Sequence, residues 1–201
     1  MSEENKLSES EIKEEAIQTL ERINFWISNC DTKISFSLAF AGILLGGFFS
    51  SGIITGSLNK LMKGLKEIDK DTPYLKIQYL KIQYLEITTV VLVVFIILII
   101  VSLTYLFKGK KGSIDTGIYN EADLSKDSTL FFGTIQNKSF IAYKNSMIGI
   151  KKDELVNDYL SQVYINSKIC NRKFTLYNKG VNWLIASTIA FIILNGMFLF
   201  L

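Results

Sequence analysis

The chain has 201 residues, of which 49% are hydrophobic and 20% are charged, and its formal net charge is +3. Histidine is absent, so the commonest general base and the commonest metal ligand are both missing. The two cysteines, Cys30 and Cys170, form no CxxC or other metal-ligand spacing and are expected to be small buried side chains. Composition therefore disfavours an enzyme, a metal site and a disulfide framework.

Hydrophobic residues are concentrated in three uncharged runs, residues 34–56, 87–107 and 181–201. An α-helix rises about 1.5 Å per residue, so each run is long enough to cross a hydrocarbon core of about 30 Å. A soluble domain could bury one such run but hardly three. The sequence therefore predicts an all-α membrane protein with three transmembrane helices and a small cytoplasmic helical domain.

Residues 1–33 are predicted to form a cytoplasmic amphipathic helix. Ser8 and Glu11 have the spacing of a capping box, so the helix is expected to begin there. We expect its apolar face to dock on the protein's own soluble part rather than to form a coiled-coil seam, because it covers barely three heptads. The apolar stripe leads into the first span and comprises Ile12, Ala16, Leu20, Ile23, Ile27, Cys30 and Ile34.

The first span, residues 34–56, has small residues at every fourth position: Gly42, Gly46 and Ser50. A face of this kind lets another helix backbone approach closely, so we expect it to serve in helix packing. The alternative is a lipid anchor with incidental glycines.

The segment 57–86 is predicted to be an extracytoplasmic loop. It begins with an amphipathic helical pattern that Pro73 interrupts. The sequence YLKIQ then occurs twice, at 74–78 and 79–83, and is expected to form a helix that continues into the second span. That span, residues 87–107, is rich in β-branched residues and has no small-residue face, so it is predicted to be the most lipid-exposed helix.

The segment 108–180 is predicted to be cytoplasmic and helical. Its apolar stretch LFFGTI, residues 130–135, is expected either to plug the small core or to form a ligand wall or partner contact. A short helix is predicted from Ser139, and a long helix of about 73 Å is predicted from Asp153 to the end of the third span. The long helix has an apolar stripe that is expected to pack against the N-terminal one: Leu155, Tyr159, Val163, Asn166, Cys170, Phe174, Tyr177 and Val181.

The third span, residues 181–201, contains Thr188 and Asn195, which lie one heptad apart on the same face. Polar side chains in a span usually bond neighbouring helices, and the alternative is that they line a water path or pore.

Positive charge predicts the orientation, because basic residues accumulate on the cytoplasmic side of a membrane. The N-terminus and residues 108–180 are therefore expected in the cytoplasm, although Lys60, Lys63 and Lys66 oppose this orientation. The basic residues beside the spans are Lys108, Lys110, Lys111, Arg172, Lys173 and Lys179.

No P-loop, GxGxxG, HExxH or GxSxG motif occurs in the chain. One loop contains four acidic residues whose spacing does not fit a calcium-binding loop: Asp115, Glu121, Asp123 and Asp127. Three membrane helices with a modest cytoplasmic part indicate a receptor-effector rather than a catalyst.

Four features occur together: the amphipathic helix that ends in Asp31-Thr32-Lys33, two further spans, LFFGTI, and DYLSQVYINSKICNRKFTLYNKG before the last span. This combination resembles the transmembrane effectors of Pycsar, the bacterial anti-phage system signalled by cyclic pyrimidine mononucleotides. Phe132-Gly133 and Lys173-Phe174 resemble the family's Phe-Gly and Lys-aromatic positions, whereas Ile34 stands where an alanine is expected.

The resemblance implies that a cyclase makes cCMP or cUMP after infection. The effector would then sense this nucleotide and impair the inner membrane, which stops growth before phage release. It implies a multi-pass inner-membrane protein with no enzymatic activity, no cofactor and no nucleic-acid polymer as partner. The competing hypothesis is a non-catalytic membrane anchor or assembly subunit that recruits a cytoplasmic partner.

A cyclic mononucleotide has one negative charge and a flat base, so it requires a cation and an aromatic or apolar wall. Arg172 and Lys173 have an alternative role in contacting anionic lipid. We also expect a homo-oligomer whose small-residue faces repack on activation. The candidate nucleotide-binding residues are Lys33, Phe132, Tyr143, Lys144, Arg172 and Lys173, with Tyr177 as a further aromatic.

Overall fold

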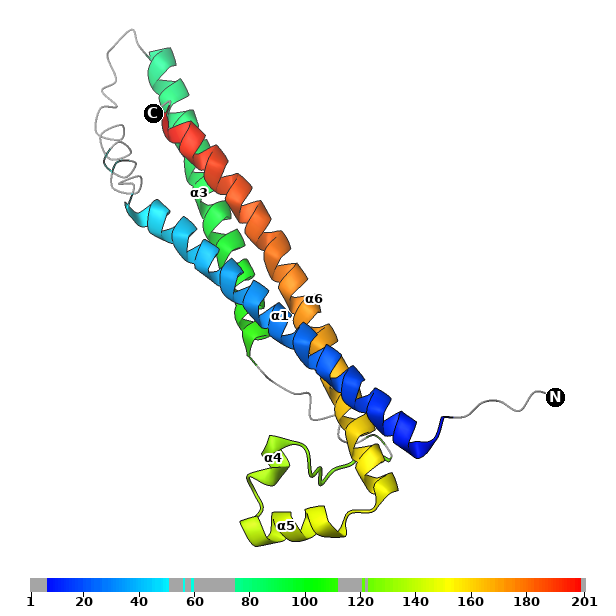
Figure 1. Ribbon diagram of the computed structural model, residues 1–201. Coiled ribbons are helices and arrows are strands. Elements are labelled where there is room, and N and C mark those ends of the chain that lie inside the picture. Colours follow the sequence, from blue (N-terminus) through cyan, green and yellow to red (C-terminus); the bar gives the residue numbers. More distant parts are fainter. Residues whose placement is uncertain are drawn as a thin grey trace, which may run out of the picture. The chain divides into compact units, whose positions relative to one another are not determined.

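The computed structural model describes residues 7–50, 56, 59, 75–111, 121 and 123–199. Its helices are α1 (Glu9–Ser50), α3 (Leu75–Lys110), α4 (Phe132–Ile135), α5 (Phe140–Gly149) and α6 (Lys152–Leu199) (Figure 1). Three of them, α1, α3 and α6, are long and apolar enough to cross a membrane, which confirms the predicted all-α class. The predicted amphipathic pattern at residues 58–68 falls almost wholly outside the described residues.

The chain forms two compact units. Unit 1 comprises Met1–Thr32 and Lys111–Thr175, and unit 2 comprises Lys33–Lys110 and Leu176–Leu201. Helices α1 and α6 each contribute residues to both units.

The predicted helix starts are confirmed at α1, α3 and α5. At α1, the Ser8 N–H donates to Glu11 Oε2 at 2.7 Å, and the Glu11 N–H donates to Ser8 Oγ at 3.4 Å, as in a capping box. Helix α3 includes the YLKIQ repeat from Leu75 onward. At α5, Ser139 Oγ accepts from the Ala142 N–H at 3.2 Å.

Helix α6 begins at Lys152, one residue before the predicted start, and continues unbroken to Leu199. The Lys151 N–H, just ahead of the helix, donates to Glu154 Oε2 at 3.3 Å. Asp153 therefore lies in the first turn rather than at the cap, where its carboxylate still complements the helix dipole.

In unit 1, α1 and α6 run side by side in the same direction. The Asn166 side chain donates to Asn24 Oδ1 at 2.9 Å, and further along both helices Lys173 Nζ lies 2.5 Å from Asp31 Oδ1. The Trp26 ring also lies edge-on to the ring of Phe174, with 6.3 Å between centroids. The predicted pairing of the two amphipathic helices is confirmed within this unit.

The apolar stripe of α1 is confirmed, because all seven predicted residues are at least partly buried. The predicted stripe of α6 is confirmed in the same sense, because all eight residues from Leu155 to Val181 are partly buried. The more deeply buried side chains beside it form an offset face that is largely polar and that the sequence did not predict: Asp158, Ser161, Gln162, Ile165 and Lys173.

In unit 2, α3 runs antiparallel to its segments of α1 and α6 (Figure 1). Phe95 of α3 lies 5.3 Å from Phe48 of α1 and 5.6 Å from Phe191 of α6, measured between ring centroids. Leu194 of α6 completes the apolar core with them. Aromatic pairs of this geometry contribute about 0.5–1.5 kcal/mol beyond the area they bury.

Helices α3 and α6 approach closely at Gly180. The Ser102 hydroxyl donates to the Gly180 carbonyl at 2.8 Å, and a Cβ added at Gly180 would lie 2.8 Å from Leu106 Cγ. Near the other end of the pair, the Tyr84 hydroxyl donates to the Met197 carbonyl in the last turn of α6, also at 2.8 Å. Two interhelical hydrogen bonds thus link α3 to α6.

Among the described residues of unit 2, nothing packs against the small-residue face of α1. A Cβ added at Gly42 or Gly46 would meet nothing within 4 Å, and Ser50 is exposed. The buried side chains in this part of α1 include Leu44 and Phe48. The helix-packing role of the small-residue face stays a prediction.

Polar side chains in the last part of α6 bond their own helix. Thr188 Oγ1 donates to the Leu184 carbonyl at 2.8 Å, and Asn195 Nδ2 donates to the Phe191 carbonyl at 2.7 Å. Each bond uses one side-chain donor within α6, and no bond from Thr188 or Asn195 to a neighbouring helix occurs among the described residues. The predicted pore role of Thr188 and Asn195 stays a prediction.

Candidate functional site

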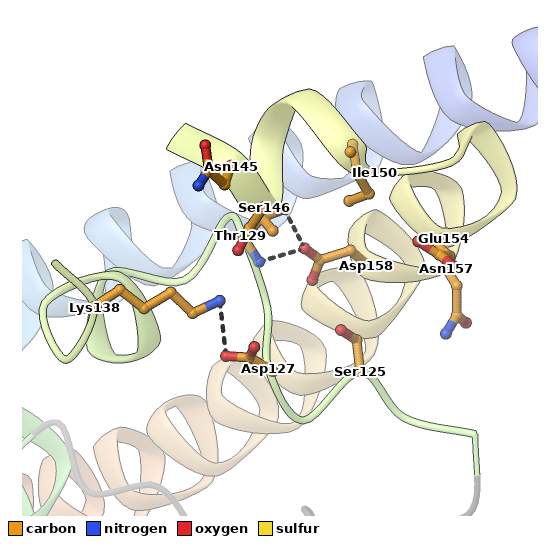
Figure 2. A pocket seen from close by; sticks show the side chains of 11 residues that line it. Ser125, Asp127, Thr129, Lys138, Asn145, Ser146, Ile150, Glu154, Asn157 and Asp158 are labelled. Carbon is orange, nitrogen blue, oxygen red and sulfur yellow. Dashed lines mark hydrogen bonds and ion pairs between the residues drawn. The ribbon is translucent and has the colours of Figure 1, made fainter. Parts of the chain in front are cut away.

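A cleft of about 500 Å³ lies in unit 1, against α5, the first turns of α6 and the polar segment that precedes α5 (Figure 2). Pockets for small molecules generally measure about 300–1,000 Å³, so this volume fits a nucleotide-sized ligand. The side chains and backbone that line it are Ser125, Asp127, Thr129, Lys138, Asn145, Ser146, Gly149, Ile150, Glu154, Asn157 and Asp158.

Helix α5 forms one wall because the chain reverses sharply after it. The helix ends at Gly149, Ile150 is extended, and α6 begins at Lys152. Asn145 and Ser146 line the cleft, so α5 presents polar side chains to it. Other faces of α5 are apolar and open: Phe140, Ile141 and Ile148 are each more than 70% exposed.

The opposite wall is a polar segment tied to α6 by hydrogen bonds. Ser128 Oγ accepts from the N–H groups of Leu130 and Phe131 and from the Gln162 side chain at 3.2 Å. The Ser125 N–H donates to Ser161 Oγ at 3.0 Å. These bonds hold the segment over the polar buried face of α6.

Asp158 is the most deeply buried charged residue of the cleft, with 2% of its surface exposed. Its Oδ2 accepts from both the backbone N–H and the hydroxyl of Thr129, at 2.7 and 2.9 Å. Its Oδ1 is also buried and, among the described residues, has no hydrogen-bond partner. The carboxylate is therefore held in place through one oxygen while the other is left unsatisfied.

Lys138 is the cation that lines the cleft. Its Nζ lies 2.9 Å from Asp127 Oδ1, and Figure 2 shows this pair on the side opposite Asn157. The Lys138 side chain is 15% exposed, whereas that of Asp127 is 78% exposed. An ion pair with one partner in water contributes little, about 0–1 kcal/mol, so a stronger anion can displace Asp127.

None of the six residues predicted to bind nucleotide lines the described cleft. Lys33, Lys144 and Arg172 are exposed, Tyr143 is half-buried, and Phe132 is 74% exposed. Lys173 is buried in the ion pair with Asp31. Their predicted role in binding is untested by this arrangement.

No residue of the stretch LFFGTI is fully buried, and its role as a plug of the small core stays a prediction. It contributes α4, a single turn in which no residue is buried, and the Phe131 and Phe132 rings lie 4.8 Å apart. A wall or partner contact remains as the alternative for this stretch.

Sequence reasoning missed Lys138 and Asp158. Asp158 falls between positions of the predicted apolar stripe, where a charged residue is expected to face water. The available signal was the concentration of polar residues at Asp158, Ser161 and Gln162 on one helix face. In the part of the chain that the structure describes, no cluster of acidic or cysteine side chains is arranged to hold a metal ion.

Comparison with known proteins agrees with the sequence resemblance. The family model of the Pycsar effector protein domain, PycTM, matches residues 77–200. The chain is also 91% identical to the Pycsar effector protein GmPycTM of Gulbenkiania mobilis, over all 201 residues of both chains. The chain belongs to the Pycsar effector family. No solved structure matches it.

The PycTM match includes α6 and the cleft residues from Ser125 to Asp158. The region that places this chain among the Pycsar effectors therefore contains the whole lining of the cleft. Helix α1 lies outside the matched residues, although the relative from Gulbenkiania mobilis matches it as well.

Proposed function

We propose that the chain is a non-catalytic anti-phage effector that binds a cyclic pyrimidine mononucleotide, cCMP or cUMP, in the cleft of unit 1. Binding then leads to disruption of the inner membrane and abortive infection. Membership of the Pycsar effector family is the observation that carries this proposal. The cleft supports it with a suitable volume and a partly buried lysine.

The charges of the cleft decide how a nucleotide would lie. Three carboxylates, Asp127, Glu154 and Asp158, oppose one lysine, so the phosphate is expected to bind only at Lys138. Asp127 is 78% exposed and can turn into solvent when the phosphate replaces it. Glu154 is also largely exposed, so water screens its charge.

Helix α6 provides the route from the cleft to the membrane part. Glu154, Asn157 and Asp158 lie on the same continuous helix as the third span. A ligand must bind one arrangement of this helix more tightly than another in order to shift the populations of the two. We propose that such a shift changes the packing of homo-oligomers through the small-residue face at Gly42, Gly46 and Ser50.

Orientation and lipid contact complete the proposal. The N-terminus and unit 1 lie in the cytoplasm, where the nucleotide is made. The exposed cations Lys33 and Arg172, which do not line the cleft, then contact anionic lipid headgroups.

Binding to detergent-purified protein tests the site. Lys138→Ala should weaken cCMP or cUMP binding by about 10- to 100-fold, because a hydrogen bond to a charged group contributes about 1.5–3 kcal/mol. Lys126→Ala is the matched control, since Lys126 is exposed in the same segment and does not line the cleft. Equal affinities for the two variants and the wild type would remove the cleft from the proposal.

Membrane potential in cells tests the output. Addition of the cognate cyclase should collapse the signal of a potential-sensitive dye in cells that express the chain, and Lys138→Ala should prevent the collapse. An unchanged potential under every condition contradicts the effector proposal.

A further inference from the structure

The unsatisfied oxygen of Asp158 indicates what the ligand must supply. More than about 90% of buried polar groups in folded proteins have a hydrogen-bond partner, and an orphan costs about 1–3 kcal/mol or more when charged. Asp158 lines the cleft, and its Oδ1 is buried and has no partner among the described residues. A donor that enters the cleft would remove this cost.

Thr129 fixes the direction of the free oxygen. Both the N–H and the hydroxyl of Thr129 donate to Oδ2, so rotation of the carboxylate would break two hydrogen bonds in order to satisfy Oδ1. The Thr129 backbone is itself placed by the neighbouring Ser128, whose hydroxyl accepts three hydrogen bonds. The acceptor is therefore preorganised before any ligand arrives.

We infer that Asp158 is a specificity-determining residue whose Oδ1 accepts a hydrogen bond from the bound nucleotide. This inference rests on the proposed function. An ionised carboxylate only accepts hydrogen bonds, so it selects N–H or O–H groups and repels carbonyl and phosphate oxygens.

A cyclic pyrimidine nucleotide has donors of two kinds. The base offers the exocyclic amine of cytosine or the ring N–H of uracil, and the ribose offers its 2′-hydroxyl. Lys138, at the other side of the cleft, would bind the phosphate, so the ligand spans from a cation to an acceptor. The ligand class is thus an anion that also has a donor group away from its phosphate.

Asp158→Asn is the decisive variant because it reverses the polarity of the site. The asparagine oxygen can accept from Thr129 as Oδ2 does, which directs the amide donors toward the cleft. We expect the preferred nucleotide to bind at least 10-fold more weakly to this variant. Asp153→Asn is the matched control, because it makes the same chemical change at an exposed position of α6 that does not line the cleft.

Four ligands distinguish the two sources of the donor: cCMP, cUMP and their 2′-deoxy forms. If the base donates, Asp158→Asn changes the ratio of cCMP to cUMP affinity by at least 10-fold. If the ribose donates, the 2′-deoxy forms bind the wild type at least 10-fold more weakly, and this difference disappears in Asp158→Asn. Either pattern supports the inference.

Two outcomes overturn the inference while leaving the proposed function intact. One is an unchanged affinity of Asp158→Asn for all four ligands. The other is an equal loss for all four, which would indicate a purely structural role. If none of the four ligands binds the wild type, the proposed function fails and the inference fails with it.

A wild-type measurement keeps the test valid if Asp158→Asn does not fold. The wild type is measured with two kinds of analogue: nucleotides that lack the 2′-hydroxyl, and nucleotides methylated on the donor nitrogen of the base. At least one of these analogues should bind 10-fold more weakly than the unmodified nucleotide. Equal affinity for every such analogue contradicts the inference.

Discussion

The two units of this protein differ in where several of their polar side chains find hydrogen-bond partners. In unit 2 the side chains of Thr104, Thr188 and Asn195 donate to carbonyls of their own helices. In unit 1 the side chains of Thr129 and Gln162 bond partners on other segments of the chain. Bonds within a helix suit the three candidate membrane spans, because no water is available inside a bilayer to replace a broken bond.

The contacts between helices also differ between the two units, being largely apolar in unit 2 and partly polar in unit 1. Unit 2 has an aromatic core around Phe95 and a close approach at Gly180, as expected where van der Waals packing holds helices together in lipid. Unit 1 has a largely polar buried face on α6 and an ion pair between Lys173 and Asp31. Polar networks of this kind specify one arrangement, and a ligand that competes for their partners can change it. The comparison supports the proposal that unit 1 senses the ligand, whereas the described contacts of unit 2 pack helices together.

Asp31→Ala is expected to have the largest effect on unit 1, a loss of about 3 kcal/mol in the free energy of unfolding. Breaking a buried pair costs about 3–5 kcal/mol, and the low end applies because Asp31 is about one-third exposed. Lys173→Met should cost less, since it leaves the more exposed partner behind. Thermal unfolding followed by Trp26 fluorescence measures both effects.

The double variant Asp31→Ala/Lys173→Met is the control for that pair. It should be more stable than Asp31→Ala alone. In the single variant the buried Lys173 ammonium has lost the Asp31 carboxylate, whereas the double variant has removed both charges. Strictly additive losses would show that the two side chains act independently.

Gly180→Val is expected to destabilise unit 2 by about 2 kcal/mol, the usual range for overpacking being about 1–3 kcal/mol. The new Cβ would lie 2.8 Å from Leu106 Cγ and Cδ2, and Leu106 is fully buried. Unfolding in detergent followed by circular dichroism measures the loss. Gly196→Val on the same helix is the control, since a Cβ there meets nothing within 4 Å; an equal loss would contradict the close approach.

Thr129→Val and Thr104→Val test the contrast in polar bonding directly. Thr129→Val removes the hydroxyl bond to buried Asp158 and should cost about 1 kcal/mol. Thr104 is exposed and bonds its own helix, so Thr104→Val should change stability by less than about 0.5 kcal/mol. Thermal unfolding of the two variants in one detergent compares them, and a reversed order would refute the contrast.

The smallest expected effect is a pH dependence at the start of α1. The backbone N–H of Ser8 and, next, its hydroxyl lower the pKa of Glu11 below its ordinary value of 4.5. The stabilisation is thus present above that value and is lost as the pH falls through the lowered pKa. As the pH falls through the lowered pKa of Glu11, amide hydrogen exchange in the first turn of α1 should accelerate in the wild type more than in Glu11→Gln. Identical pH profiles for the two proteins would contradict the capping role.

The sequence by itself determined the helices and the spans. These features are local or periodic, so they can be read from a short stretch of sequence. They are the length of the spans, the capping at Ser8 and Ser139, and the apolar stripe of α1. The resemblance to Pycsar effectors was also readable from short motifs, and the matches to family and relative confirm it.

Only the tertiary structure decided where the candidate site lies. The bond from Thr129 to Asp158 joins residues 29 positions apart, and the bond from Gln162 to Ser128 joins residues 34 apart. No periodic pattern marks such pairs, and a polar residue on a helix is by default assigned to the solvent side. Burial of Asp158 depends on the segment that folds over it, so the cleft emerges only when that long-range pairing is known.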